Sequence, residues 1–290
     1  MTLELVPIQS QHIPEAGRIF YEAFYQISTS HGFQPDVPGV EVAIHFMDLM
    51  SSRPGFYGVV ALLDGRPVGS NFLWLMDAVA GIGPITVDPA SQGHGVGRAL
   101  MTEVLRYAES NGIRQVRLMQ DAYNTTSLSL YASLGFDAQA EVAEMQYTPE
   151  ATETAKVGEA GVRAIAASDA EATTALCTRL YRTGRRNELA AIGEMGSPTF
   201  VRERDGRIAG YLAPGIIGHG VAESEEDALV LVHEAARIQS ARIRFFCPLS
   251  EASLFRQMLR AGCRVRKVMT LMSIGPYEEP DVVWMPSVIY

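Results

Sequence analysis

Residues 87–100 of this 290-residue chain read VDPASQGHGVGRAL, a glycine-rich loop between two apolar runs. The apolar run at 79–87 predicts a strand, and the apolar periodicity after the loop predicts a helix over about residues 95–111. Because glycine lacks a Cβ atom, several main-chain N–H groups of such a loop can converge on one anion at the helix N-terminus. The segment therefore predicts a strand–loop–helix unit that binds a phosphate group.

This loop differs from the two common nucleotide-binding loops. A Walker loop ends in Gly-Lys-Ser or Gly-Lys-Thr, whereas Gly97 is followed by Arg98 and Ala99, and the pattern Gly-x-Gly-x-x-Gly is absent. The loop instead contains Gln-x-x-Gly-x-Gly, preceded by Val-Asp-Pro. That string resembles the acyl-CoA-binding motif of the GNAT superfamily of N-acyltransferases. The resemblance implies that the loop amides hold the pyrophosphate of coenzyme A.

A second segment extends the resemblance. Residues 124–136 read NTTSLSLYASLGF, in which an Asn begins a predicted helix and a Tyr stands shortly before Gly-Phe. This arrangement resembles the GNAT pattern, and it implies that Asn124 bonds the pantetheine arm and that Tyr131 lies near the thioester sulfur. The structural alternatives are a plain helix N-cap for Asn124 and a core aromatic for Tyr131.

Acetyl transfer from a thioester to an amine requires few protein groups. Charge develops first on the carbonyl oxygen and then on the departing thiolate, so one hydrogen-bond donor for each is enough. The resemblance assigns these roles to the main-chain N–H of Val87 and to the neutral phenol of Tyr131. The acetyl-CoA site that it implies, with no metal, comprises Ile85, Val87, Gln92, Gly93, His94, Gly95, Val96, Gly97, Arg98, Asn124 and Tyr131.

The general base is left unassigned. Some GNAT members carry a Glu in the strand before the loop, but residues 81–87 contain no carboxylate. Asp121, Glu22, His31 and an ordered water are the candidates. A solvated surface group or a loop hydrogen bond is the alternative role for each side chain.

Composition limits the partners. The formal net charge of −9 disfavours nucleic acid and anionic membrane surfaces as partners. The N-terminus lacks the basic region of a signal peptide, and no stretch is long and apolar enough to span a bilayer, so we expect a cytoplasmic protein. Its three cysteines have no metal-site spacing and are expected to be buried reduced thiols.

The second half of the chain repeats features of the first. Residues 64–69 read DGRPVG and residues 205–210 read DGRIAG, each between apolar runs. This self-similarity indicates duplicated units. We therefore expect two tandem GNAT-like α/β domains, each with a mixed sheet flanked by helices. Their predicted limits are residues 1–147 and 162–290, joined by a polar linker over 148–161.

The second copy lacks the glycine-rich loop. Its counterpart at residues 221–227 reads VAESEED, with four carboxylates that would repel a pyrophosphate. We expect a degenerate second domain and one acyl-CoA per chain. The acidic segment is expected to be the start of a helix, because carboxylates favour a helix N-terminus; a cation site is the alternative.

The predicted function is acetyl-CoA-dependent N-acetyltransfer, directly to a primary amine of a small molecule or peptide. The alternative is a protein that binds acyl-CoA as a sensor or scaffold without turnover. The sequence does not select the amine acceptor, the oligomeric state, or whether the second domain shapes the acceptor site; a homo-oligomer is left open.

Overall fold

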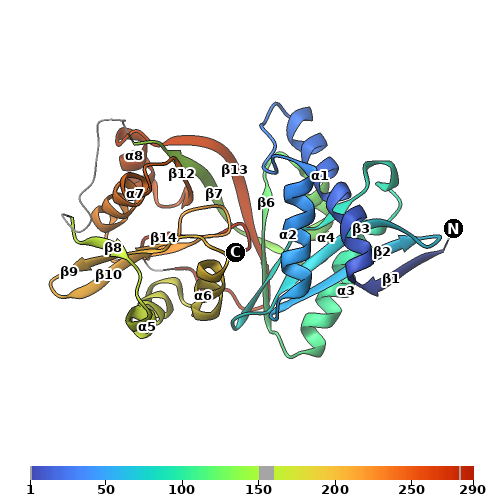
Figure 1. Ribbon diagram of the computed structural model, residues 1–290, viewed down its shortest axis with the longest axis horizontal. Coiled ribbons are helices and arrows are strands. Elements are labelled where there is room, and N and C mark those ends of the chain that lie inside the picture. The colour runs from blue at the N-terminus through green and yellow to red at the C-terminus, as the bar shows by residue number, and fades with distance from the viewer. Residues whose placement is uncertain (1, 150–159, 281) are drawn as a thin grey trace. The chain divides into compact units, whose positions relative to one another are not determined.

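The computed structural model describes residues 2–149, 160–280 and 282–290 (Figure 1). These residues form two compact units. The first consists of Met1–Leu118, Tyr123–Asp137 and Ser273–Gly275, and the second of Met119–Ala122, Ala138–Met272 and Pro276–Tyr290. Most of the linker expected over 148–161 lies outside the described residues.

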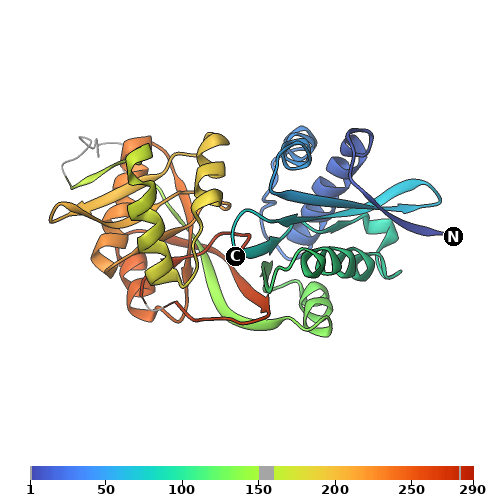
Figure 2. The ribbon, with the colours of Figure 1, turned by 90° about the horizontal axis from the view of Figure 1, so that it is seen from below.

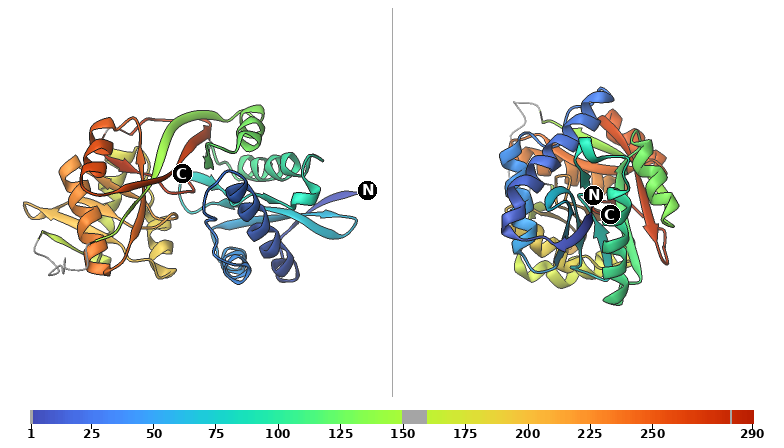
Figure 3. Two further views of the ribbon diagram at one scale, coloured as in Figure 1. Left: turned by 90° about the horizontal axis from the view of Figure 1, so that it is seen from above. Right: turned by 90° about the vertical axis from the view of Figure 1, so that its right-hand side faces the viewer.

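The first unit carries the glycine-rich loop. Its elements are β1 (Leu3–Pro7), η1 (Ser10–His12), α1 (Ile13–Ser30), α2 (Val40–Ser52), β2 (Phe56–Leu63), β3 (Arg66–Trp74), β4 (Val79–Ile82), β5 (Thr86–Val87), η2 (Pro89–Ser91), α3 (Val96–Ser110), most of β6 (Gln115–Asp121) and α4 (Thr125–Ser133). Strands β1, β2, β3, β4 and β6 follow one another in the sheet. Helices α1 and α2 cover one face of this sheet, and α3 and α4 cover the other (Figures 2 and 3).

The turn between β2 and β3 explains why the sequence repeat is informative. Asp64 and Gly65 both have positive φ, 48° and 80°, as a two-residue hairpin turn requires. Asp205 and Gly206 repeat these values, 53° and 72°, between β9 (Phe200–Arg204) and β10 (Arg207–Leu212). The duplicated Asp-Gly motif therefore builds the same hairpin in both units.

The second unit is also a mixed α/β fold. Its remaining elements are β7 (Asp137–Tyr147), β8 (Val162–Ala164), η3 (Ala167–Asp169), α5 (Ala170–Tyr181), α6 (Arg186–Glu194), β11 (Gly220–Ala222), α7 (Glu225–Gln239), β12 (Ile243–Pro248), α8 (Ala252–Arg260), β13 (Arg264–Ile274) and β14 (Trp284–Met285). Five strands form one sheet in the order β14-β11-β10-β9-β8, with α5 and α6 on one side and α7 and α8 on the other (Figure 1).

Strand β7 contributes to the core of the second unit. It pairs antiparallel with β12. Ala143 and Met145 of β7 are fully buried in the core that contains Leu231 of α7 and Phe245 of β12. The alternation of apolar residues along a strand determines which face is apolar, and β7 buries that face in the core of the second unit.

The second unit encloses the chain terminus and all three thiols. Trp284 and Tyr290 are each 2% exposed, and Val288 N–H donates to the Ile216 carbonyl at 2.7 Å. Cys177, Cys247 and Cys263 are free and buried, as expected. Within the described residues, every helix is too short or too polar to cross a membrane.

Candidate functional site

The glycine-rich loop connects β5 to α3 through two left-handed residues. Gly93 and Gly95 have φ of 79° and 81°, values that a side chain with Cβ rarely adopts. Gly95 is the N-cap of α3, and its carbonyl accepts from Ala99 N–H at 3.0 Å. The N–H groups of the first helical turn have no partner within their own helix. The loop therefore presents them at the positive end of the helix dipole, as an anion site requires.

Short hydrogen bonds hold the start of this loop. Asp88 Oδ1 accepts from Ala90 N–H at 2.9 Å, and the Asp88 carbonyl accepts from Ser91 N–H at 2.7 Å. Gln92 Nε2 donates to the Val87 carbonyl at 3.2 Å. The side chain of Gln92, predicted to bind the cofactor, thus closes the loop onto β5.

The remaining loop side chains divide between solvent and core. His94 is exposed, whereas Val96 is buried and anchors the first turn of α3. Arg98 Nη2 donates to Ser133 Oγ at 2.7 Å. This bond joins the first turn of α3 to the last residue of α4.

Strand pairing changes beside the loop. The parallel pairing of β4 with β6 extends from Val79↔Gln115 to Gly81↔Arg117. The predicted single strand over 79–87 is broken at residues 83–85, which include Ile85, and the chain continues as β5, which pairs with β3. Gly83 causes this break: its φ is 137°, and its carbonyl accepts from Trp74 Nε1 at 2.7 Å. Val87, predicted to polarise the thioester, therefore lies on a short strand separate from the β4–β6 ladder.

Three predicted segments converge at Gly97. A Cβ atom on Gly97 would lie 3.4 Å from Leu130 Cδ2 and 3.7 Å from Val87 Cγ2. Gly97 belongs to α3, Val87 to β5, and Leu130 precedes Tyr131 on α4. The structure thus brings the loop, the short strand and the tyrosine-bearing helix together.

Asn124 and Tyr131 have the structural roles that were considered as alternatives. Asn124 is the N-cap of α4: its Oδ1 accepts from Ser127 N–H at 3.1 Å. Tyr131 is 6% exposed, and its ring centroid lies 6.1 Å from that of Phe136. The cap uses one lone pair of the Asn124 side-chain oxygen. Binding of a cofactor by the same side chain is therefore compatible with capping.

The three candidate base side chains are held differently. Glu22 pairs with Arg18 on α1, and Arg18 also reaches Asp88 Oδ2 at 3.3 Å. His31 stacks on Tyr123, with ring centroids 5.0 Å apart. Asp121 Oδ1 lies 2.6 Å from Lys267 Nζ in the second unit. Glu22 and Asp121 are thus both engaged by cations, and the base stays unassigned.

Sequence reasoning missed three residues around this region. Phe33 also stacks on Tyr123, and the two ring centroids lie 4.5 Å apart. Tyr123 directly precedes Asn124, and this adjacency was the one available signal. Lys267 had none, because its partner Asp121 lies in the other half of the sequence.

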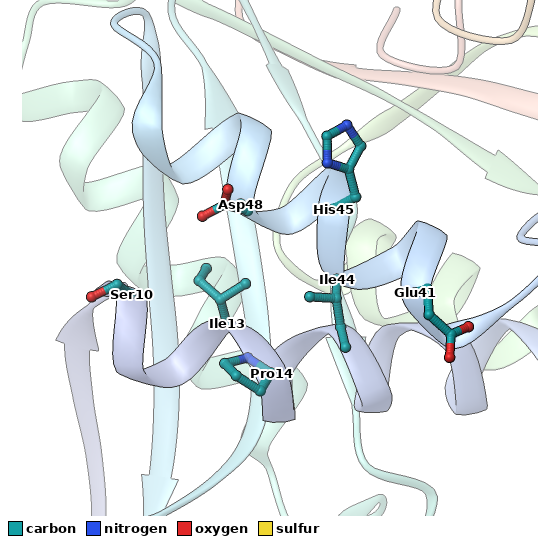
Figure 4. Close-up of a pocket in the computed structure, with 7 residues that line it drawn as sticks. All are labelled: Ser10, Ile13, Pro14, Glu41, Ile44, His45 and Asp48. Atoms are coloured by element: carbon teal, nitrogen blue, oxygen red, sulfur yellow. The ribbon is translucent and has the colours of Figure 1, made fainter.

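A separate groove of about 410 Å³ opens on the first unit (Figure 4). Its lining residues come from η1, α1 and α2, and are Ser10, Ile13, Pro14, Glu41, Ile44, His45 and Asp48. The glycine-rich loop, α3 and α4 contribute none of them. The groove is therefore not the predicted acyl-CoA site.

Solved structures match nearly the whole chain and define the class of fold. A GCN5-related N-acetyltransferase from Sphaerobacter thermophilus matches with a TM-score of 0.65 and 17% identity, over 96% of this chain and 97% of that one. A tandem GNAT protein from the clavulanic acid biosynthesis pathway matches with a TM-score of 0.60 and 14% identity, over 96% and 100%. The chain thus has a tandem GNAT-like α/β fold.

Sequence comparison matches one segment of the chain to a known family. Residues 20–136 match the model of the acetyltransferase (GNAT) family. The chain is 33% identical over 104 residues to mycothiol acetyltransferase of Amycolatopsis mediterranei, covering 36% of this chain and 29% of that protein. It is 32% identical over 131 residues to the enzyme of that name from Thermobifida fusca, covering 43% and 36%. The chain spans about a third of these relatives' length, and the similarity to the GNAT family lies in its segment 20–136.

Proposed function

We propose that this chain is an acetyl-CoA-dependent N-acetyltransferase that transfers an acetyl group directly to a primary amine. The observation that carries the proposal is the convergence at Gly97 of the glycine-rich loop, β5 and the tyrosine-bearing helix α4. The start of α3 can bind an anion, and α4, which packs against it through Leu130, carries the phenol of Tyr131; thioester aminolysis needs both elements. The similarity of segment 20–136 to the GNAT family supports the same activity.

The residues fit an acyl-CoA. Gly93 and Gly95 leave the loop free of side-chain bulk, and the first-turn amides of α3 provide donors for the pyrophosphate oxygens. Arg98, in the same turn, adds a positive charge within reach of those oxygens. Asn124 holds the pantetheine arm at the start of α4. Acetyl-CoA supplies the activated acetyl group.

Each remaining role follows from the charge that develops during transfer. As the amine nitrogen bonds to the acetyl carbon, the N–H of Val87 stabilises the carbonyl oxygen. When the carbon–sulfur bond breaks, Tyr131 donates its phenolic proton to the thiolate. The ammonium proton of the amine leaves to a base or to water. Because the transfer is direct, no covalent acetyl–enzyme intermediate is required.

A screen of primary amines tests this proposal. Purified full-length protein is mixed with acetyl-CoA and each amine, and free CoA thiol is measured over time. The panel contains polyamines, aminoglycosides, amino acids, lysine peptides and the acceptor of the mycothiol acetyltransferases, since the matched relatives carry that name. Amine-dependent thiol release at catalytic rates is expected. Saturable acetyl-CoA binding without release for any amine would instead support a sensor.

A further inference from the structure

A buried lysine from the second half of the sequence contacts the end of β6. Lys267 of β13 is 7% exposed, and its Nζ lies 2.6 Å from Asp121 Oδ1. Val268 follows Lys267 on β13, and Ala122 follows Asp121. The Val268 carbonyl accepts a hydrogen bond from Ala122 N–H at 3.1 Å. Both pairs belong to the second unit. Two successive residues of β13 therefore hold two successive residues at the end of β6.

The surrounding charges make Asp121 the principal partner of this lysine. Glu144 Oε2 lies 3.9 Å from Lys267 Nζ, beyond hydrogen-bond distance. The other oxygen of Glu144 accepts from Arg244 Nε at 2.5 Å and lies 3.1 Å from Arg266 Nε. Of the two carboxylates with measured distances to Lys267 Nζ, Asp121 at 2.6 Å is therefore closer than Glu144 at 3.9 Å. A buried ammonium requires such a partner.

The held residues lead directly into the proposed site. Ala122 is followed by Tyr123 and by Asn124, the N-cap of α4, and α4 carries Tyr131. We propose that Lys267 is a positioning residue for acetyl transfer, which fixes the start of α4 through its ion pair with Asp121. This inference rests on the proposed function.

Four variants of the full-length protein test the proposal. Lys267→Met removes the charge but keeps the side-chain length, and Lys267→Arg keeps the charge. The double variant Lys267→Met with Asp121→Asn removes both charges, so it leaves no buried carboxylate unpaired. Arg163→Met is the matched control, because Arg163 forms an ion pair of 2.7 Å with Asp169 in the same unit without contacting Asp121 or Ala122.

The measurements are kcat, the Kd for acetyl-CoA, and amide hydrogen exchange of residues 122–128. Lys267→Met is expected to lower kcat about tenfold, to raise Kd about fivefold, and to speed exchange at 122–128 at least tenfold. Lys267→Arg should recover most of each loss, and the double variant should recover most of the change in Kd and in exchange, whereas Arg163→Met should stay within twofold of the native protein.

Two results would overturn the inference. One is native kcat and native exchange in Lys267→Met. The other is a loss of kcat with native exchange at 122–128, which would give Lys267 a role other than positioning. If the native protein transfers no acetyl group, the exchange and binding measurements still decide whether Lys267 holds the start of α4. A failure of the proposed activity is thereby distinguished from a failure of this inference.

Discussion

Arg98 and Ser133 are joined by a hydrogen bond of 2.7 Å between the guanidinium Nη2 and the hydroxyl oxygen. Arg98 stands in the first turn of α3, and Ser133 is the last residue of α4. The guanidinium has five N–H donors in a planar fork, and this bond uses one of them. Arg98 can therefore contact a phosphate while it remains tied to α4.

Arg98 has two roles that can be tested separately: binding of a phosphate and the hydrogen bond to Ser133. Arg98→Ala is expected to raise KM for acetyl-CoA about tenfold, because a charge-assisted bond to a phosphate is worth about 1.5 kcal/mol. Ser133→Ala removes only the link between the helices and should change KM less than twofold. Steady-state kinetics with varied acetyl-CoA provides both values. An equal effect of the two variants would show that Arg98 acts through α4 alone.

Gly95→Ala should weaken acetyl-CoA binding through backbone strain. A φ of 81° costs a residue with Cβ about 1–2 kcal/mol, so the loop would shift away from its amide-presenting conformation. An increase of about tenfold in the Kd for acetyl-CoA is expected in calorimetric titration. Gly193→Ala in α6 is the control, since no atom lies within 4 Å of its added Cβ. A native Kd in Gly95→Ala would argue against amide binding at this turn.

The second unit should bind no acyl-CoA. Ser224 caps α7 by accepting from Asp227 N–H at 3.1 Å, which occupies a donor that an anion would need. Glu223, just before this helix, pairs with Arg179 at 2.6 Å and with Arg207 at 2.5 Å. These two arginines are already engaged by Glu223 and so are not free partners for a pyrophosphate. Calorimetric titration should give one acetyl-CoA per chain, and a stoichiometry of two would contradict the assignment.

Stability should fall below neutral pH because of one buried histidine. His219 is 2% exposed in the second unit, and burial, with Arg185 nearby, lowers its pKa well below the usual value. Below about pH 6.5 the unfolded chain binds a proton there that the folded chain does not, so the unfolding free energy decreases as pH falls. The slope from this site approaches about 1.4 kcal/mol per pH unit.

Fluorescence of Trp284 can measure how the unfolding free energy changes with pH. The chain has two tryptophans, and Trp74→Phe leaves Trp284, which is buried in the second unit 5.5 Å from the Tyr181 ring. In that background, urea unfolding at pH 7 and pH 5 should show the loss of stability, and His219→Phe should reduce it. His45→Gln, which alters an exposed imidazole of α2, is the control. An equal pH dependence with and without His219 would refute the assignment.

Local sequence patterns predicted the elements around the glycine-rich loop. Apolar periodicity predicted α3 to within a few residues, because this helix buries one apolar face. The Asp-Gly repeat predicted duplicated units, and both copies form the same turn, since Asp64 and Asp205 accept the positive φ that a two-residue turn requires. The helix start at Asn124 was also predicted, whereas the roles of Asn124 and the loop toward the cofactor stay predictions. Their conformations follow from adjacent residues.

Long-range pairings were missed. Lys267 and Asp121 form an ion pair at 2.6 Å from opposite halves of the sequence, and no local pattern links them. No local pattern indicates that His219 is buried, with its Nδ1 3.9 Å from Glu188 Oε1. Tertiary packing determines such contacts, whereas periodicity reports only which face of an element is apolar.

Replacement of Tyr131 by phenylalanine tests the proposed chemistry most directly, because it removes one hydroxyl from a ring that is already buried. If Tyr131 protonates the thiolate, kcat for amine acetylation falls about a hundredfold or more, while the Kd for acetyl-CoA measured by calorimetry stays within twofold. An unchanged kcat, or a loss of affinity equal to the loss of turnover, would contradict the role of Tyr131 as the general acid.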